Sequence, residues 1–219
     1  MFTALIATAV FFKFLVPQSR NAALNTILDL AGIALMLAGF LLRITARGYK
    51  ADHSADGVKL VLGGVYVLTR NPMYLGTFLI GTGVSLFIFN WWAAPLFCLV
   101  FLLIYIPQIR KEEKVLSLRF GDEYKLYCQA TPRFFPRPLN LFKPGLRENL
   151  LFKWRWVKKE LPSLLGVIIL FAVTSIWKDR KLFGGIRYQE RTAELFLFIF
   201  CLFIIAAMFY EKENVPKKV

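Results

Sequence analysis

The sequence predicts an all-α integral membrane protein with about five to six membrane helices. Its 219 residues are 57% hydrophobic and include 22 phenylalanines, which is too apolar for a soluble domain of this size. Several runs approach the roughly 20 apolar residues that a helix needs to cross a bilayer. The charged residues collect between these runs. Apolar length and charge placement together indicate a chain that crosses the membrane several times.

Six apolar runs carry this prediction, and the first and fifth of them are short. In chain order they are 2–16, 24–42, 73–89, 92–107, 164–177 and 193–210. A secretory signal has positive charge before its apolar part, whereas the first run has its lysine, Lys13, at the far end. We therefore expect the first run to be retained as a membrane helix.

The net charge of +14 indicates contact with anionic lipid rather than with nucleic acid. Thirteen Lys/Arg and six Asp/Glu lie in 109–162, and five and two lie in 43–72. Basic loops between membrane helices favour the cytoplasmic side, next to anionic headgroups. The uncharged turn at 90–92 contains two tryptophans and is expected outside. Residues 178–191 hold five basic residues where simple spans place an outer loop. Either run 164–177 is re-entrant, or the charge rule fails there.

The sequence shows no pattern typical of a metal site. Its three cysteines form no C-x-x-C pair, and the one histidine, His53, stands in a polar stretch. Buried or lipid-facing cysteines and a solvated histidine are the expected states. We therefore expect no metal.

The chain divides into three parts by the character of its residues. Residues 1–57 are predicted to form a two-helix membrane anchor, 58–146 a core with every polar constellation of note, and 147–219 a basic connector with two more apolar helices. The connector sequence ENLLFKWRWVKKEL places apolar residues on one helical face. A helix lying in the membrane interface and a helix docked on the protein both fit that pattern.

A polar collar, formed by Arg70, Asn71 and Pro72, precedes the third apolar run. Asn71 is a favourable N-cap residue and Pro72 suits the first helical position. The sequence therefore predicts a helix that begins sharply at the membrane edge, with its amide groups available to an anion. Arg70 adds a permanent positive charge beside them.

The helix after the collar has two faces of small residues. At 100° per residue, Tyr74, Thr77, Gly81 and Ser85 share one side, and Gly76 and Gly83 lie opposite. Taken by themselves, the glycines favour close packing of neighbouring membrane helices. The polar side chains favour a cleft inside the protein, because on a lipid-facing surface they would find no hydrogen-bond partners.

Two adjacent glutamates, Glu112 and Glu113, follow the fourth run. Their side chains point about 100° apart on a helix, so we expect one to face a cavity and the other to pair with a local lysine or arginine. A solvated charge run is the alternative. Before them, Pro107 is expected to bend or break the helix.

Beyond the glutamates, Gly121 is placed to end the helix. A second short helix with Tyr124 and Tyr127 is expected to begin at Asp122 and to end at Pro132. The segment TPRFFPRP after it could cover a site from above or anchor in the interface.

These motifs resemble those of a known group of membrane methyltransferases. RNPMYLG (70–76) resembles the R-H/N-P-x-Y-x-G signature of enzymes related to isoprenylcysteine carboxyl methyltransferase. GTG (81–83) with the glutamate pair resembles the G-x-G and E-E elements of phosphatidylethanolamine N-methyltransferases. EEKVLSLRFGDEYKLYCQATPRFFP resembles the segment that both share. The resemblance covers roughly residues 58–138.

The resemblance implies S-adenosylmethionine as methyl donor, bound near the cytoplasmic surface without a Rossmann domain. Carried onto this chain, the cofactor contacts fall on Arg70, Asn71, Tyr74, Thr77, Gly81, Gly83, Glu112, Glu113, Tyr124, Tyr127 and Arg133. Catalytic roles are expected of Arg70, Tyr74 and Glu113. Asn71 stands where histidine is common, so the proton role of that histidine is not carried over.

The expected reaction is methyl transfer to a lipophilic acceptor that enters from the bilayer. A carboxylate or thiol acceptor is favoured because no histidine base accompanies the motifs, and a phospholipid amine remains an alternative. A sterol-type membrane reductase that uses NADPH is a second hypothesis. A non-catalytic scaffold or lipid-binding protein, whose basic loops contact anionic headgroups, is the third.

Overall fold

The computed structural model describes residues 22–54, 57–137, 153, 155–157, 160 and 165–167. Its helical elements are α2 (Ala22–His53), a 3-10 helix η1 (Gly64–Val67), α3 (Pro72–Ile88) and α4 (Ala93–Ala130). The predicted runs 2–16 and 193–210 lie outside the described residues, as do loop 178–191 and most of run 164–177. The described part is all-helical, and the expected five to six membrane helices stay a prediction.

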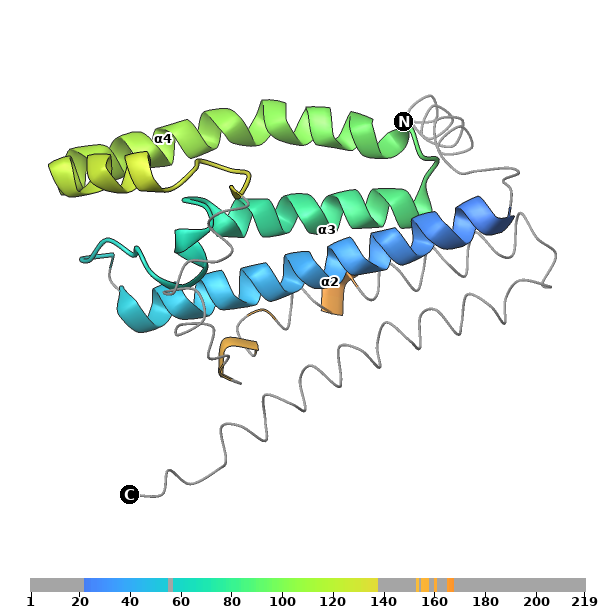
Figure 1. Ribbon diagram of the computed structural model, residues 1–219, viewed down its shortest axis with the longest axis horizontal. Coiled ribbons are helices and arrows are strands. Elements are labelled where there is room, and N and C mark those ends of the chain that lie inside the picture. Colours follow the sequence, from blue (N-terminus) through green and yellow to red (C-terminus); the bar gives the residue numbers. More distant parts are fainter. Residues whose placement is uncertain are drawn as a thin grey trace, which may run out of the picture.

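The long helices lie side by side, with α3 between α2 and α4 (Figure 1). The predicted runs 24–42, 73–89 and 92–107 are confirmed as helical, and they fall in α2, α3 and α4 respectively. Within the described residues, Thr26–His53 and Ala93–Ala130 are long and apolar enough to cross a membrane, while Pro72–Ile88 is apolar but shorter.

Glycines let α2 and α3 approach closely. A Cβ placed on Gly83 would lie 2.5 Å from the carbonyl oxygen of Gly32, and one on Gly39 would lie 2.6 Å from that of Gly76. On the other side of α3, a Cβ on Gly81 would collide with the ring of Phe97 on α4. The structure therefore shows helix packing at the glycines on both faces of α3.

We expect Gly83→Ala to lower the free energy of unfolding by about 1–3 kcal/mol, because the added methyl group meets backbone atoms of α2 that cannot move alone. Thermal unfolding of the purified protein in detergent measures this. Gly166→Ala is the matched control, since a Cβ there meets nothing within 4 Å. Equal stability of the two variants would contradict the packing account.

The predicted break of the helix at Pro107 is wrong, whereas a bend there stays a prediction. Pro107 lies inside α4, and the one residue of α4 with non-helical dihedral angles is Gly121, at φ 52° and ψ −121°. Apolar helices tolerate proline where neighbouring groups can satisfy the freed carbonyl. The positive φ at Gly121 favours glycine. There α4 folds back on itself (Figure 1), and it ends at Ala130, as the position of Pro132 predicts.

The described part of the connector is docked on α2. The ring of Trp156 packs directly over Gly48, and its indole nitrogen donates to Asp52 at 3.1 Å. Glu160 is fully buried and pairs with Arg43 at 3.3 Å and Arg47 at 3.0 Å. These contacts lie on the part of α2 that extends beyond its apolar run, and they stabilise that part as a helix.

Candidate functional site

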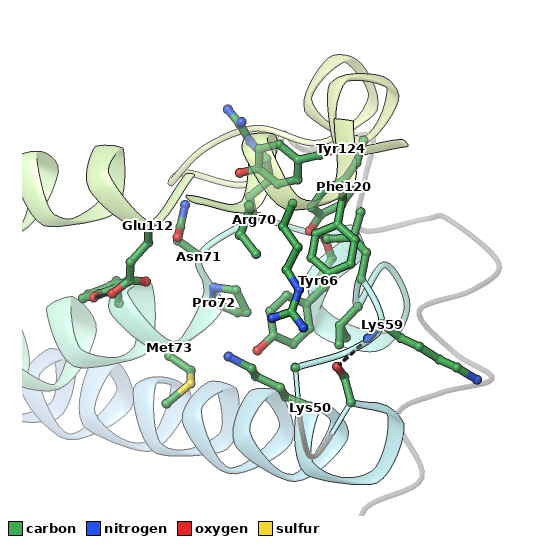
Figure 2. Close-up of a pocket in the computed structure, with 18 residues that line it drawn as sticks. Lys50, Lys59, Tyr66, Arg70, Asn71, Pro72, Met73, Glu112, Phe120 and Tyr124 are labelled. Carbon is green, nitrogen blue, oxygen red and sulfur yellow. Dashed lines mark hydrogen bonds between the residues drawn. The ribbon is translucent and has the colours of Figure 1, made fainter. Parts of the chain in front are cut away.

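A half-enclosed cavity of about 260 Å³ lies where the end of α2, the following loop, η1, the start of α3 and the second half of α4 meet (Figure 2). Its polar and charged lining comes from every one of these elements. The lining residues with polar side chains are Lys50, Ser54, Lys59, Tyr66, Arg70, Asn71, Tyr74, Glu112, Arg119, Tyr124 and Tyr127.

The collar begins α3 where the sequence predicts. Pro72 is the first helical residue and Asn71 occupies the N-cap position. The side chain of Asn71, however, makes no capping hydrogen bond. Its amide nitrogen donates instead to the carbonyl oxygen of Arg133 at 2.9 Å and to Glu113 at 3.3 Å. The first-turn amides of α3 therefore need partners from outside the helix.

Glu113 joins three segments of the chain. Its carboxylate is buried and pairs with Arg70 at 3.3 Å and with Arg133 at 2.8 Å. The backbone supports the same junction, because the amide of Arg70 donates to the carbonyl oxygen of Pro132 at 2.9 Å. Glu113 thus fixes the collar and the segment after α4 to the middle of α4, and it does not line the cavity.

Glu112 points the other way and lines the cavity. It accepts hydrogen bonds from the hydroxyl of Tyr74 at 2.5 Å and from Gln108 at 3.2 Å. The prediction that the two glutamates face different surroundings is confirmed. The expected local partner of the paired glutamate is wrong, because Arg70 and Arg133 are both distant in sequence.

Two buried polar atoms in the described residues lack a hydrogen-bond partner, and both belong to residues of the cavity wall. They are Nε of Arg70 and the hydroxyl of Tyr124. Arg70 uses Nη1 to donate to the sulfur of Cys128 at 2.6 Å. Buried polar groups in proteins are nearly always hydrogen-bonded. Nε and the hydroxyl are therefore the points at which the protein's own contacts leave this wall unsatisfied.

Two further tyrosines are fixed by backbone contacts. The hydroxyl of Tyr127 donates to the carbonyl oxygen of Tyr66 at 2.7 Å, and that of Tyr66 donates to the carbonyl oxygen of Ala46 at 3.4 Å. Burial raises the pKa of Tyr66 well above its usual value, so this residue stays protonated and holds η1 against α2.

The structure brings Arg70, Asn71, Tyr74, Glu112, Tyr124 and Tyr127 of the predicted set to one cavity. Thr77, Gly81, Gly83, Glu113 and Arg133 lie outside its lining. Thr77 accepts a hydrogen bond from Arg43, and the two glycines face neighbouring helices. Three further residues of the lining, Lys50, Lys59 and Arg119, were not predicted from the sequence. No short motif contains them together, and the fold alone brings them to one wall.

Among the described residues, no group of three His, Cys, Asp or Glu side chains could hold a metal ion.

Residues 28–123 match the family described as phospholipid methyltransferase. The nickel-cobalt-cadmium resistance protein NccN of Alcaligenes xylosoxydans xylosoxydans is 36% identical over 123 residues, which cover 56% of this chain and 54% of the relative. Protein-S-isoprenylcysteine O-methyltransferase of Schizosaccharomyces pombe is 34% identical over 77 residues, covering 35% and 33%. Protein-S-isoprenylcysteine O-methyltransferase B of Arabidopsis thaliana is 30% identical over 113 residues, covering 48% and 57%.

The chain spans about half or less of the length of these relatives. No solved structure matches it. The matched range begins in α2 and ends just beyond Gly121, so it contains the collar and both glutamates.

Proposed function

We propose that this chain transfers a methyl group from S-adenosylmethionine to a lipophilic acceptor at a membrane. The motif resemblance over roughly residues 58–138 and the match of residues 28–123 to the phospholipid methyltransferase family support this proposal. The observation that carries the proposal is the convergence of the collar, the pair Tyr74 and Glu112, and the unpartnered Tyr124 hydroxyl on one cavity. The long apolar helices support a multi-pass membrane protein with its basic loops on the cytoplasmic side.

The residues of the cavity fit the methyl donor. Its carboxylate suits the positive charge of Arg70, which lines the cavity, and the first-turn amides of α3, which are favourable sites for an anion. Its ribose hydroxyls or its ammonium group suit Glu112, whose carboxylate faces the cavity. The rings of Tyr124 and Tyr127 can contact the adenine or stabilise the sulfonium by cation–π attraction, on the order of 0.5–2 kcal/mol.

When bound, S-adenosylmethionine supplies a methyl group that leaves its sulfonium in an in-line displacement. The chain contributes alignment and exclusion of water, effects that can lower a barrier by roughly 7–11 kcal/mol. Arg70 orients the donor and is itself held by Glu113. Because two arginines neutralise Glu113, its role in this proposal is to position Arg70. If the acceptor must lose a proton, the carboxylate of Glu112 is the group placed to take it, through the hydroxyl of Tyr74, which passes its own proton to Glu112 as it receives the acceptor's.

A carboxylate or thiol acceptor needs little base catalysis, and an amine would depend on Tyr74 and Glu112. Incubating membranes that contain the protein with methyl-labelled donor, followed by extraction, tests the proposal. We expect label in a lipid-soluble product and none with the Arg70→Met variant. Absence of transferred label from wild-type membranes, whatever fraction is examined, would contradict the proposed function.

Ligand protection against heat separates the methyltransferase from an NADPH-dependent reductase. A ligand at 100 times its dissociation constant stabilises the folded protein by about 2.7 kcal/mol. We expect S-adenosylmethionine to raise the unfolding temperature of the purified protein and NADPH to leave it unchanged, since the glutamate pair and the Arg70–Tyr74 motif resemble those of the methyltransferases and not of the reductases. Protection by NADPH alone would favour the reductase.

A further inference from the structure

The cavity has two chemically different ends. Glu112 lies at one end, and the aromatic residues Tyr66, Phe120 and Tyr124 lie toward the other (Figure 2). Among the described residues that line the cavity, Glu112 is the only acidic one. A carboxylate attracts a cation, whereas aromatic rings suit a flat, neutral base. The sulfonium and ammonium groups of S-adenosylmethionine therefore fit the Glu112 end, and its adenine fits the aromatic end.

Tyr74 supplies an aromatic ring beside Glu112. It lines the same cavity, and its hydroxyl donates to the carboxylate of Glu112 at 2.5 Å. Gln108 donates to the same carboxylate oxygen at 3.2 Å. A phenol that donates to a carboxylate gains electron density in its ring, so the face of that ring attracts a cation more strongly. A negative charge and an electron-rich ring thus lie together at this end of the cavity.

Tyr105 on α4 lies outside the cavity lining and contacts the ring of Tyr74. The centroids of the two rings are 5.5 Å apart, and their planes are inclined by 60°. Tyr105 is itself stacked on the buried ring of Phe101, with centroids 4.2 Å apart. Tilted and stacked pairs of this kind are favourable. The orientation of Tyr74 is therefore set at its hydroxyl by Glu112 and at its ring by Tyr105.

We propose that Tyr74 and Glu112 form the subsite for the sulfonium of the methyl donor, and that Tyr105 is a positioning residue that fixes the Tyr74 ring for this contact. The inference rests on the proposed function and narrows it, because it sets the direction in which the donor lies. Methyl transfer breaks the bond between sulfur and the methyl carbon, leaves its electron pair on sulfur and forms a bond from the acceptor to that carbon. The sulfur is then neutral, so this subsite attracts the donor more strongly than the product.

Titration calorimetry of the purified full-length protein with S-adenosylmethionine and, separately, with S-adenosylhomocysteine tests the subsite. The two ligands differ only in the methyl group and the charge on sulfur, so the ratio of their dissociation constants isolates the sulfonium. We expect Tyr74→Leu to shift this ratio against S-adenosylmethionine by about fivefold and Tyr105→Leu by about threefold. Tyr105→Phe keeps the ring and should stay within about twofold of the wild type. Both ligands are titrated into one preparation, so an unfolded fraction does not change the ratio.

Phe120→Leu is the matched control, because Phe120 lines the aromatic end of the cavity. It should weaken both ligands alike and leave their ratio within about twofold of the wild type. A shifted ratio in Phe120→Leu alone would overturn the subsite and place the sulfonium at the aromatic end. Binding of both ligands with an unchanged ratio in Tyr74→Leu would overturn the subsite and leave the proposed function intact, and an unchanged ratio in Tyr105→Leu alone would overturn the positioning role. If the wild type binds neither ligand, the proposed function fails together with the subsite.

Discussion

Replacing Glu113 by alanine is expected to destabilise the protein by about 3 kcal/mol and to abolish binding of S-adenosylmethionine. Glu113 is buried between Arg70 and Arg133, and removal of one member of a buried ion pair leaves the charge of its partner uncompensated. The collar would lose its attachment to α4, because Asn71 also donates to this carboxylate. Thermal unfolding in detergent and titration calorimetry with the donor measure the two effects.

The neighbouring glutamate gives a matched control. Glu112 is exposed and pairs only with Tyr74 and Gln108 among the described residues. Glu112→Ala should therefore change the free energy of unfolding by less than about 0.5 kcal/mol while still weakening donor binding. A Glu112→Ala protein that is as unstable as Glu113→Ala would contradict the division of roles between the two carboxylates.

Replacing Arg70 by methionine is expected to weaken donor binding at least 30-fold. The substitution keeps a long side chain but removes the unpartnered Nε and the charge beside the start of α3. Loss of one partner from a buried charge pair costs about 2–5 kcal/mol, and each 1.4 kcal/mol corresponds to a factor of ten. Titration calorimetry on the purified protein gives the ratio of dissociation constants.

Arg110→Met is the control for this experiment, because Arg110 is exposed on α4 and outside the cavity lining. Its donor affinity should stay within about twofold of the wild type, since surface substitutions away from a site have small effects. If the Arg70→Met variant binds the donor as tightly as the wild type, the guanidinium of Arg70 does not contribute to donor binding.

Local features of the helices could be predicted because their causes are local. The apolar runs, the start at Asn71 and Pro72, and the break at Gly121 each depend on residues within one or two turns. The extension of α2 to His53 could not be predicted in this way. It is supported by Trp156 over Gly48 and by Glu160, which are more than 100 positions away in the chain.

The candidate site was predictable in its composition but not in its geometry. The two glutamates were expected to face different surroundings because adjacent helical residues diverge. The sequence could not reveal that Arg133, 20 positions along, is a partner of Glu113. The glycines at 81 and 83 illustrate the opposite difficulty. A small residue suits both a ligand and a helix, and in this fold Phe97 and α2 occupy the space beside them.

The central claim is that the methyl donor binds in the collar cavity, and photo-cross-linking tests it most directly. Purified full-length protein is irradiated with methyl-labelled S-adenosylmethionine, digested, and the labelled peptides are identified. We predict label in peptides that contain Tyr66 to Tyr74 or Phe120 to Tyr127, suppressed by excess unlabelled donor. Label that is confined to the peptide with Gly81 and Gly83, or that unlabelled donor does not suppress, would contradict the account.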